Sequence, residues 1–374
     1  MKIQSIELST VAVPLTKPFK TALRTVHTAY STYVKITTED GKTGWGEAPP
    51  THVITGDSMA SIAYTIEEVL APKLIGLDIR NRAELFTILH KSIIGNTSAK
   101  AALDMAIYDL VGQRAGMPLY QFLGGHKNTL ETNFTVSVND PDEMSEDAVR
   151  YIAEGFTTLK VKVGTGSAEL DIERVKAIRD RVGHTVKIRL DANQGWQAKE
   201  AVRTIGAMED ANLGIELVEQ PVHAEDIEGL RYVTHHTLTP IMADESVFSP
   251  NDALRVLQNR AADFINIKLM KSGGIHEALK INSLAESYGV ECMTGSMIET
   301  KLGITAAAHF AASQPNVTRC DFDAPLMLNG DPIVGGVQYS QKTVTLPQQK
   351  GLGVQIDSSW LTHHRTSGNE GELR

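Results

Sequence analysis

Two lysines stand two residues apart in the stretch TTLKVKVGTG, residues 157–166, which alternates like a β-strand. Successive side chains of a strand point to opposite faces, so Lys160 and Lys162 share a face. A third lysine, Lys268, ends the strand-like stretch FINIK. A lysine that lies near a cation and is partly removed from water has its pKa lowered toward neutrality, where it can act as a base. These residues therefore suggest acid–base chemistry by Lys162 and Lys268, with Lys160 as a charged neighbour.

Three carboxylates stand late in three further strand-like stretches that follow one another along the chain: Asp191, Glu219 and Asp244. Neighbouring strands lie about 4.8 Å apart, so the tips of consecutive strands can meet on one small ion. A set of oxygen ligands without His or Cys favours Mg²⁺. We therefore predict one Mg²⁺ per subunit, bound by these three side chains.

The elements that must position these residues are short β-branched runs that alternate with helical stretches from about residue 130. Eight such units at a regular pitch favour a closed parallel barrel over an open sheet, and in such barrels the functional groups come from the carboxyl ends of the strands. We predict a (β/α)7β barrel of the TIM type, with one anchor residue in each strand: Thr135, Lys160, Asp191, Glu219, Asp244, Lys268, Gly295 and Asp321.

The rest of the chain predicts a second structural unit. Residues 1–125 read as strands followed by helices, which is typical of a separate α+β domain that caps the barrel. The barrel is expected over 126–325, and the Gly-rich segment 326–361 is expected to return to the capping domain. Residues 362–374 are a polar tail. Trp45 and Glu47, in the motif GWGEAPP, are expected to be structural.

Composition excludes several classes of protein. The 374 residues are 42% hydrophobic and 22% charged, as in ordinary globular proteins, and the formal net charge of -9 argues against nucleic acid or an anionic membrane as partner. No apolar run approaches the roughly 20 residues that span a bilayer. The N-terminus alternates like a strand and does not resemble a signal peptide. With two cysteines, the chain is expected in the cytoplasm, and we expect a homo-oligomer.

The positions of the lysines suggest a reaction. Lys162 and Lys268 fall four strands apart, so in a barrel they flank the three carboxylate strands. Two bases on opposite sides of a metal-held carboxylate suggest proton removal from the adjacent carbon on one face and return on the other. The result is inversion by a racemase or epimerase. The alternative is that the lysines only form ion pairs with acids at the strand ends.

The motifs then identify a resemblance that covers nearly the whole chain. PFKTALRT, GWGEAPP, KVKVG, LDANQGW, VEQP, ADES, NIKLMKSGG and CDFDAPL follow in order, as in the muconate-lactonizing-enzyme subgroup of the enolase superfamily. Within this subgroup the chain is most similar to the dipeptide epimerases of the L-Ala-D/L-Glu epimerase family. The resemblance implies a Mg²⁺-dependent isomerase of murein peptide metabolism. Such an enzyme interconverts L-Ala-L-Glu and L-Ala-D-Glu through a Mg²⁺-stabilised enediolate.

The same resemblance implies how a small dipeptide is held. Asp321 and Asp323 would bind its free ammonium, and Arg24 would meet the glutamate side-chain carboxylate, for which a guanidinium offers paired donors. An extended dipeptide spans about 7 Å, enough to reach from the metal to the far strand. The remaining residues expected to line the substrate pocket are Thr135, Lys160, Ser296, Met297 and Ile298.

Other activities remain open from the sequence. An o-succinylbenzoate synthase, a muconate cycloisomerase or an N-acylamino acid racemase would use the same site, but their substrates carry no ammonium for Asp321 and Asp323. A non-catalytic Mg²⁺-dependent peptide-binding protein would need only one of the two flanking lysines for charge. A Schiff-base aldolase would need one lysine and no carboxylate triad.

Overall fold

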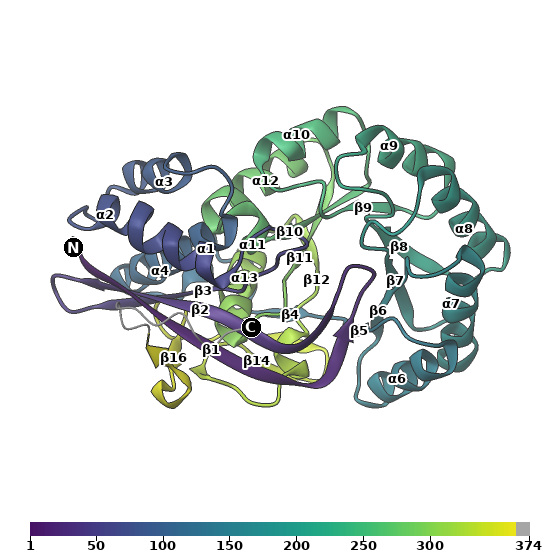
Figure 1. The fold of residues 1–374 in the computed structure, drawn as a ribbon, viewed down its shortest axis with the longest axis horizontal. Coiled ribbons are helices and arrows are strands. Elements are labelled where there is room, and N and C mark those ends of the chain that lie inside the picture. The colour runs from purple at the N-terminus through teal and green to yellow at the C-terminus, as the bar shows by residue number, and fades with distance from the viewer. Residues whose placement is uncertain (364–374) are drawn as a thin grey trace.

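The computed structural model describes residues 1–363. Figure 1 shows a small part with long antiparallel strands, which contains the N-terminus, beside a larger part in which helices surround a curled sheet. The carboxyl ends of the strands of that sheet carry the candidate site.

The larger part is built on an eight-stranded parallel sheet whose strands follow in chain order. A single parallel bridge between Thr132 and Cys320 joins its two edges, so the sheet curls round on itself. Each of the eight predicted stretches contains a strand, and the predicted barrel fold is confirmed. The strands are β5 (Phe134–Val136), β6 (Thr158–Lys162), β7 (Lys187–Asp191), β8 (Ile215–Glu219), β9 (Ile241–Ala243), β10 (Phe264–Lys268), β11 (Glu291–Gly295) and β12 (Val317–Cys320).

Helices cover the outer face of this sheet (Figure 1). Serine side chains cap two of them: Ser167 accepts a hydrogen bond from the Leu170 amide and Ser249 from the Asp252 amide. These bonds satisfy amide groups that have no partner within the helix. The helical elements are α6 (Pro141–Ala153), α7 (Ala168–Val182), α8 (Ala198–Asp210), α9 (Ile227–His236), α10 (Pro250–Gln258), α11 (Leu269–Ser272), α12 (Ile275–Ser287), α13 (Lys301–Ser313) and the short η2 (Ala324–Met327).

The smaller part contains an antiparallel sheet in the order β17-β1-β2-β3. Its strands are β1 (Ile3–Lys20), β2 (Thr25–Thr38), β3 (Thr43–Ala48) and β17 (Thr362–His363). Helices follow the first three strands, as the sequence predicts for a capping domain. They are α1 (Met59–Tyr64), η1 (Thr65–Leu70), α2 (Ala71–Leu74), α3 (Arg82–Lys91), α4 (Thr97–Ala115) and α5 (Leu119–Phe122).

Two glycines of β3 permit α4 to lie directly against the sheet. A Cβ on Gly44 would lie 2.2 Å from the Ala106 carbonyl oxygen, and one on Gly46 would lie 1.9 Å from that of Ala102. Real Cβ atoms do not approach backbone this closely, so only glycine fits. This close packing leaves the inner residues of α4 buried between the capping sheet and the barrel.

The C-terminal segment contacts both parts through short strands. β14 (Gln338–Ser340) and β15 (Thr343–Thr345) form a three-stranded sheet with β4 (Thr129–Glu131), and β13 (Ile333–Gly335) pairs with β16 (Val354–Ile356). β17 follows the short helix η3 (Ser358–Trp360). β17 pairs with β1 of the capping sheet. The predicted polar tail therefore starts with a short strand, and its residues 364–374 lie outside the described part. We propose that the capping domain, the barrel and the C-terminal segment end at about residues 125, 325 and 361, as the sequence predicts.

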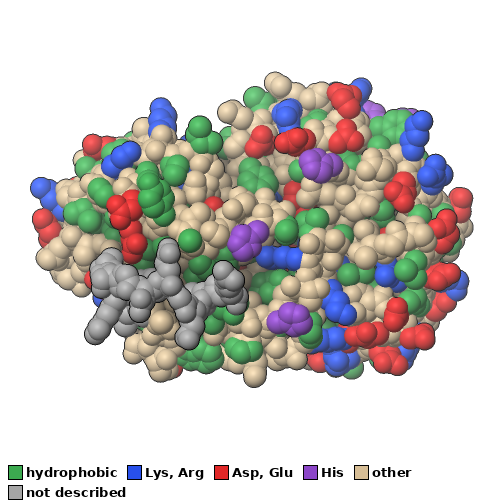
Figure 2. All heavy atoms as spheres, viewed as in Figure 1, with side chains coloured by type: hydrophobic (Ala, Val, Ile, Leu, Met, Phe, Trp, Pro, Cys, Tyr) green, Lys and Arg blue, Asp and Glu red, His purple; other side chains and the backbone are tan. Residues whose placement is uncertain are grey.

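Acidic and basic side chains are interspersed over the face of the molecule seen in Figure 2. Among the helices of residues 1–363, none is both long and apolar enough to cross a membrane.

Candidate active site

The predicted lysines and carboxylates meet at the carboxyl ends of the barrel strands. Lys162 of β6 lies in register with Asp191 of β7, and Asp191 lies in register with Glu219 of β8. Asp244 follows β9, and Lys268 ends β10. The two lysines therefore flank the three strands from which the carboxylates come, as predicted from the strand order.

Lys160 lies at the centre of this group. Its Nζ is 2.9 Å from Asp191 Oδ2, 2.8 Å from Glu219 Oε2 and 2.9 Å from Asp321 Oδ2. Burial lowers the pKa of Lys160, but the neighbouring carboxylates raise it more, so the pKa lies well above its ordinary value. Lys160 is therefore a buried cation in this arrangement, consistent with its predicted role as an electrostatic partner.

The two flanking lysines each pair with a predicted metal ligand. Lys162 Nζ is 2.6 Å from Asp191 Oδ2 and also donates to Asn193 Oδ1. Lys268 Nζ is 2.6 Å from Asp244 Oδ2. Burial lowers the pKa of Lys268, but Asp244, Glu219 and Glu245 together raise it more, so it lies above its ordinary value. The lowered pKa expected for a lysine beside a cation is thus not seen here, and it stays a prediction for the metal-bound site.

The sequence analysis missed a fourth lysine at this site. Lys271, which is fully buried, places Nζ 2.7 Å from Asp244 Oδ1 and donates to the carbonyl oxygens of Val247 and Asn266. Its position three residues after Lys268, in the motif NIKLMKSGG, was the only available signal. Because Lys271 holds the Asp244 carboxylate and backbone carbonyls together, its role here is to position Asp244.

The carboxylates are also oriented by neutral donors. Asn266 Nδ2 donates to Glu219 Oε1 at 2.8 Å, and the Asn193 amide donates to Asp191 Oδ1 at 2.9 Å. Burial and the charge of Asp191 raise the pKa of Glu219 to about 8. Burial raises the pKa of Asp244, but Lys268 and its neighbours lower it more, so the pKa lies below the ordinary value. One carboxylate oxygen of Glu219 and one of Asp191 are thus held by hydrogen bonds, and nearby charges shift the pKa values of Glu219 and Asp244.

The arrangement of Asp191, Glu219 and Asp244 and their donor chemistry bear differently on metal binding. Within residues 1–363, no three His, Cys, Asp or Glu side chains are gathered so that they could hold a metal ion by themselves. The lysine ammonium groups lie among the carboxylates, so the three tips do not meet as the sequence analysis expected. The donor chemistry nevertheless suits Mg²⁺, because Asp191, Glu219 and Asp244 are buried carboxylates at the ends of neighbouring strands.

The charge of the surroundings also fits a cation. Six buried acidic side chains stand against four buried lysines in this part of the barrel, which leaves an excess of acidic groups. The acidic side chains are Asp191, Glu219, Asp244, Glu245, Asp321 and Asp323, and the lysines are Lys160, Lys162, Lys268 and Lys271. Buried carboxylates need a compensating positive charge, which a divalent ion or a substrate ammonium can supply.

A cavity of about 50 Å³ lies directly above these groups. Its lining includes every residue predicted to contact substrate or transfer protons: Arg24, Thr135, Lys160, Lys162, Lys268, Ser296, Met297, Ile298, Asp321 and Asp323. The capping domain closes the cavity with Phe19, Thr21, Leu23, Val53 and Ile54. One water molecule needs roughly 10–15 Å³ of such space, so the cavity holds only a few waters, and a dipeptide can enter only if lining side chains or capping segments move.

Two residues of the capping domain stand out in this lining. Arg24 is partly buried and forms no ion pair with any residue in the described part of the chain, and burial lowers its pKa. Its guanidinium is therefore available to a ligand carboxylate. Phe19, which the sequence analysis missed, lies with its ring centroid 5.8 Å from Lys162 Nζ. This ring lies against the lysine in a cation–π contact, which is attractive.

The predicted ammonium site lies on the opposite wall. Asp321 Oδ1 accepts a hydrogen bond from Asn133 Nδ2 at 2.7 Å, and Asp323 Oδ2 accepts one from the Thr135 amide at 2.6 Å. Burial and the charge of Asp321 raise the pKa of Asp323 to about 7. The two aspartates therefore lie close enough to interact, and a cation placed near both would favour their ionised forms.

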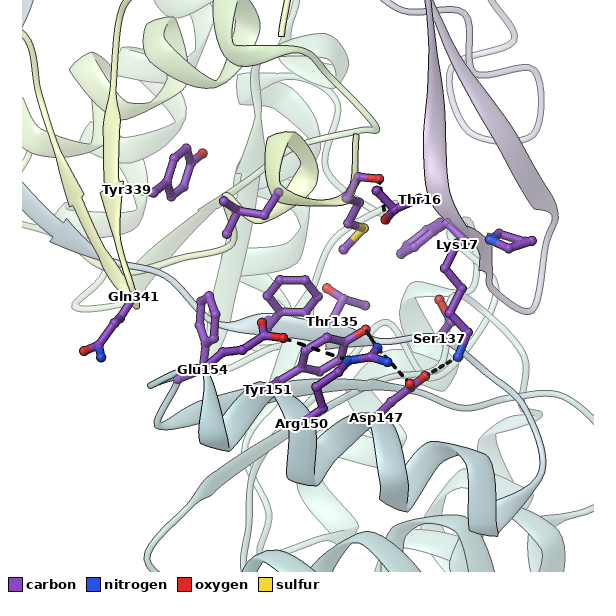
Figure 3. A pocket seen from close by; sticks show the side chains of 16 residues that line it. Thr16, Lys17, Thr135, Ser137, Asp147, Arg150, Tyr151, Glu154, Tyr339 and Gln341 are labelled. Carbon is purple, nitrogen blue, oxygen red and sulfur yellow. Dashed lines mark hydrogen bonds and ion pairs between the residues drawn. The ribbon is translucent and has the colours of Figure 1, made fainter. Parts of the chain in front are cut away.

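A second and larger cavity of about 670 Å³ adjoins this site and shares Phe19 and Thr135 with it. Figure 3 shows that its lower wall is a chain of charged side chains from α6. Asp147 accepts hydrogen bonds from Lys17 at 2.6 Å and from Arg150 at 2.9 Å. These charges are therefore paired with one another in the space between α6 and β1.

Comparison with known proteins defines the class of this chain. Residues 5–124 match "Mandelate racemase / muconate lactonizing enzyme, N-terminal domain", and residues 143–360 match "Enolase C-terminal domain-like". The chain belongs to the mandelate racemase and muconate lactonizing enzyme group of the enolase superfamily, as the motifs indicated.

Particular relatives are dipeptide epimerases. L-Ala-D/L-Glu epimerase of Bacillus subtilis (strain 168) is 61% identical over 354 residues, which cover 95% of this chain and 97% of the relative. A substrate-liganded structure of that epimerase has a TM-score of 0.94 over 95% of this chain and 99% of its own. The dipeptide epimerase of Enterococcus faecalis V583, solved with Mg and L-Leu-L-Tyr, has a TM-score of 0.92 at 48% identity over 95% and 99%.

A relative of another specificity is also similar. N-succinyl-L-Arg/Lys racemase of Bacillus cereus is 35% identical over 363 residues, which cover 96% of this chain and 97% of the racemase. The family therefore includes enzymes named for substrates with and without a free α-ammonium.

Proposed function

We propose that this protein is a Mg²⁺-dependent epimerase that inverts the α-carbon of the C-terminal residue of a dipeptide, with L-Ala-L-Glu and L-Ala-D-Glu as the preferred pair. One observation carries the proposal: Lys162 and Lys268 line the same cavity from strands on either side of the three carboxylate strands. The relatives named as dipeptide epimerases support the substrate class.

The chain's own residues divide the chemistry between them. Asp191, Glu219 and Asp244 would hold Mg²⁺, which when bound supplies positive charge to the substrate carboxylate. Lys162 takes the α-proton from one face, and Lys268 gives a proton to the other face; the reverse reaction exchanges these roles. Lys160 adds a fixed positive charge beside Lys162. The closed capping segments exclude water from the exchanging protons.

The two ends of the cavity define the substrate. Asp321 and Asp323 bind the free ammonium, and Arg24, on the capping segment, binds the side-chain carboxylate of glutamate. Ser296, Met297, Ile298 and Thr135 line the space between these ends. An N-acylamino acid would bring no ammonium to Asp321 and Asp323, of which, within residues 1–363, only Asp321 is paired with a lysine, Lys160, and this disfavours the alternative of N-acylamino acid racemisation.

The central test measures epimerisation of L-Ala-L-Glu with and without Mg²⁺. We expect turnover with Mg²⁺, loss of turnover after chelation and dialysis, and recovery when Mg²⁺ is restored. Asp244→Asn should lower turnover at least about 100-fold, because the site loses a charged oxygen ligand. Undiminished turnover after exhaustive chelation would contradict the metal assignment.

A second test addresses the ends of the substrate. N-Propionyl-L-glutamate has the shape of L-Ala-L-Glu without its ammonium, so it should react about 10- to 150-fold less well, the value of one or more charge-assisted hydrogen bonds. Arg24→Ala should penalise L-Ala-L-Glu far more than L-Ala-L-Leu. If the propionyl compound reacts as well as the dipeptide, the protein is an N-acylamino acid racemase.

We also propose a cytoplasmic location and a homo-oligomeric state. Cys292 and Cys320 are both free and buried, which suits a reducing compartment. Light scattering of the purified protein measures the oligomeric state directly.

A further inference from the structure

The seam of the barrel, where β12 meets β5, is unusual because side chains hold it together. An isolated backbone bridge joins Thr132, just before β5, to Cys320 at the end of β12. Beyond it, Thr132 Oγ1 accepts a hydrogen bond from the Phe322 amide at 2.8 Å, and Asn133 Nδ2 donates to Asp321 Oδ1 at 2.7 Å. Asp321, which faces the cavity, is thus tied to the opposite edge of the sheet by its own side chain.

The direction of the bond from Asn133 is fixed by a second contact. Arg189 Nη1 donates to Asn133 Oδ1 at 3.2 Å. A guanidinium can only donate, so the amide must turn its oxygen to Arg189 and its NH₂ to Asp321. Arg189 is itself held by Glu216, whose Oε2 accepts from Nε at 2.8 Å. The chain of contacts therefore presents a donor, and never a lone pair, to Asp321.

The burial of these groups makes the arrangement rigid. Asn133 is 1% exposed and Arg189 is 7% exposed, so neither side chain can exchange its partner for bulk water. With Oδ1 bound to Asn133, the carboxylate of Asp321 can direct only Oδ2 to the neighbouring ammonium of Lys160 and to the cavity. One oxygen is used for orientation, and the other, which already accepts a hydrogen bond from Lys160, keeps a second lone pair for a further cation.

We propose that Asn133, oriented by Arg189, is a positioning residue that sets selectivity for substrates with a free ammonium by fixing the carboxylate of Asp321. This inference rests on the proposed dipeptide epimerase function and adds a residue to it. Without the amide donor, Asp321 can rotate toward Lys160 with both oxygens, and the ammonium of the substrate loses a correctly placed partner. Proton transfer at the other end of the substrate is not directly changed.

The test compares two substrates in one set of variants. The measurement is the ratio of kcat/KM for L-Ala-L-Glu to that for N-propionyl-L-glutamate, followed by α-proton exchange in D₂O, together with the thermal midpoint. Asn133→Leu keeps the branched shape of the side chain, with larger methyl groups, and removes the donor. We expect its ratio to fall about tenfold, the lower value of a hydrogen bond to a charged group. Asn133→Ala also removes the donor, and the same fall in the ratio is expected from it if the leucine variant does not fold.

A matched control separates positioning from barrel closure. Thr132→Val removes the neighbouring seam contact to Phe322 and leaves the Asp321 side chain untouched. It should lower the thermal midpoint as the Asn133 variants do, yet leave the substrate ratio within about twofold of the unchanged protein. An unchanged ratio in the Asn133 variants, or an equal fall in Thr132→Val, would overturn the inference. If the unchanged protein does not epimerise the dipeptide at all, it is the proposed function that fails.

Discussion

Lys162 and Lys268 are both buried, yet each keeps its ammonium group against a carboxylate. Such pairing explains how four lysines can be kept at one buried site of the barrel, because a buried ammonium without a partner would cost several kcal/mol. It also means that substrate and metal must compete with lysine for the same oxygens. At the scale of single residues, catalysis therefore depends on exchanging one set of ion pairs for another.

Isotope exchange should separate the two lysines. Lys268→Ala is expected to lose epimerisation at least about 100-fold but to exchange the α-proton of one stereoisomer with D₂O, because Lys162 still serves one face. Lys162→Ala should show the opposite preference, and we expect Lys162 to serve the L isomer. The measurement is deuterium incorporation by mass spectrometry from each pure stereoisomer. Equal residual exchange from both isomers in each variant would rule out two bases.

At the scale of elements, the amino end of α13 joins the capping domain to the cavity. Glu47 of β3 is fully buried and accepts hydrogen bonds from the Thr300 amide at 2.9 Å and the Gly303 amide at 2.8 Å. These amides belong to the first turn of α13, where an anion is favoured. The same turn follows Met297 and Ile298, which line the cavity. The contacts with the amino end of α13 therefore support the expectation that Glu47 is structural.

Glu299, beside this junction, should make stability depend on pH. Burial and the charge of Glu47 raise the pKa of Glu299 to about 8, while Lys268 lowers it, against an ordinary value of 4.5. Between these values the folded protein holds a proton that the unfolded chain has lost, so the free energy of unfolding falls as pH rises, by up to about 1.4 kcal/mol per pH unit. Below 4.5 both states are protonated, and above 8 both are ionised.

Glu299→Gln should remove this dependence, because its amide mimics the protonated carboxyl at every pH. We expect a flatter free energy of unfolding between pH 5 and 8 in urea titrations, and a more stable variant than the unchanged protein near pH 8. Glu228→Gln, at an exposed position on α9, is the control and should keep the slope. Part of the slope should remain, because the pKa values of Glu219 and Asp323 are raised as well. A slope in Glu299→Gln equal to that of the unchanged protein would contradict the contribution of Glu299.

At the scale of the whole molecule, buried carboxylates of the capping domain bond to backbone outside it. Asp104 of α4 accepts from the Ile275 amide at 2.6 Å and the His276 amide at 3.2 Å, both in α12. Asp109 accepts from the Leu352 amide at 2.9 Å in the C-terminal segment. Separating the parts would leave these groups without their hydrogen-bond partners.

The protein should therefore unfold as one unit. Calorimetry is expected to give a single transition whose calorimetric and van't Hoff enthalpies agree. Asp104→Ala, which leaves two buried amides of α12 without their acceptor, should shift the whole transition to lower temperature by several degrees. Two resolved transitions in the unchanged protein would show that the capping domain and the barrel unfold separately.

The sequence by itself determined the barrel, the order of its strands and the residues at their carboxyl ends. These features are local: a strand has a period of two, each unit repeats after 24 to 31 residues between anchors such as Lys160 and Asp191, and parallel strands bring their carboxyl ends to one edge. Motifs around the same strand ends indicated the family, and the comparisons confirmed it.

Only the tertiary structure decided which groups touch one another at that edge. Asn133 and Asp321 are 188 positions apart, Glu47 and Thr300 are 253 apart, and no period or spacing relates such pairs. The capture of Asp244 by Lys271 and the size of the cavity likewise depend on how side chains from different strands and from the capping domain fill one shared space. Strand position follows from local pattern, whereas partner choice among buried charges follows from the complete packing around them.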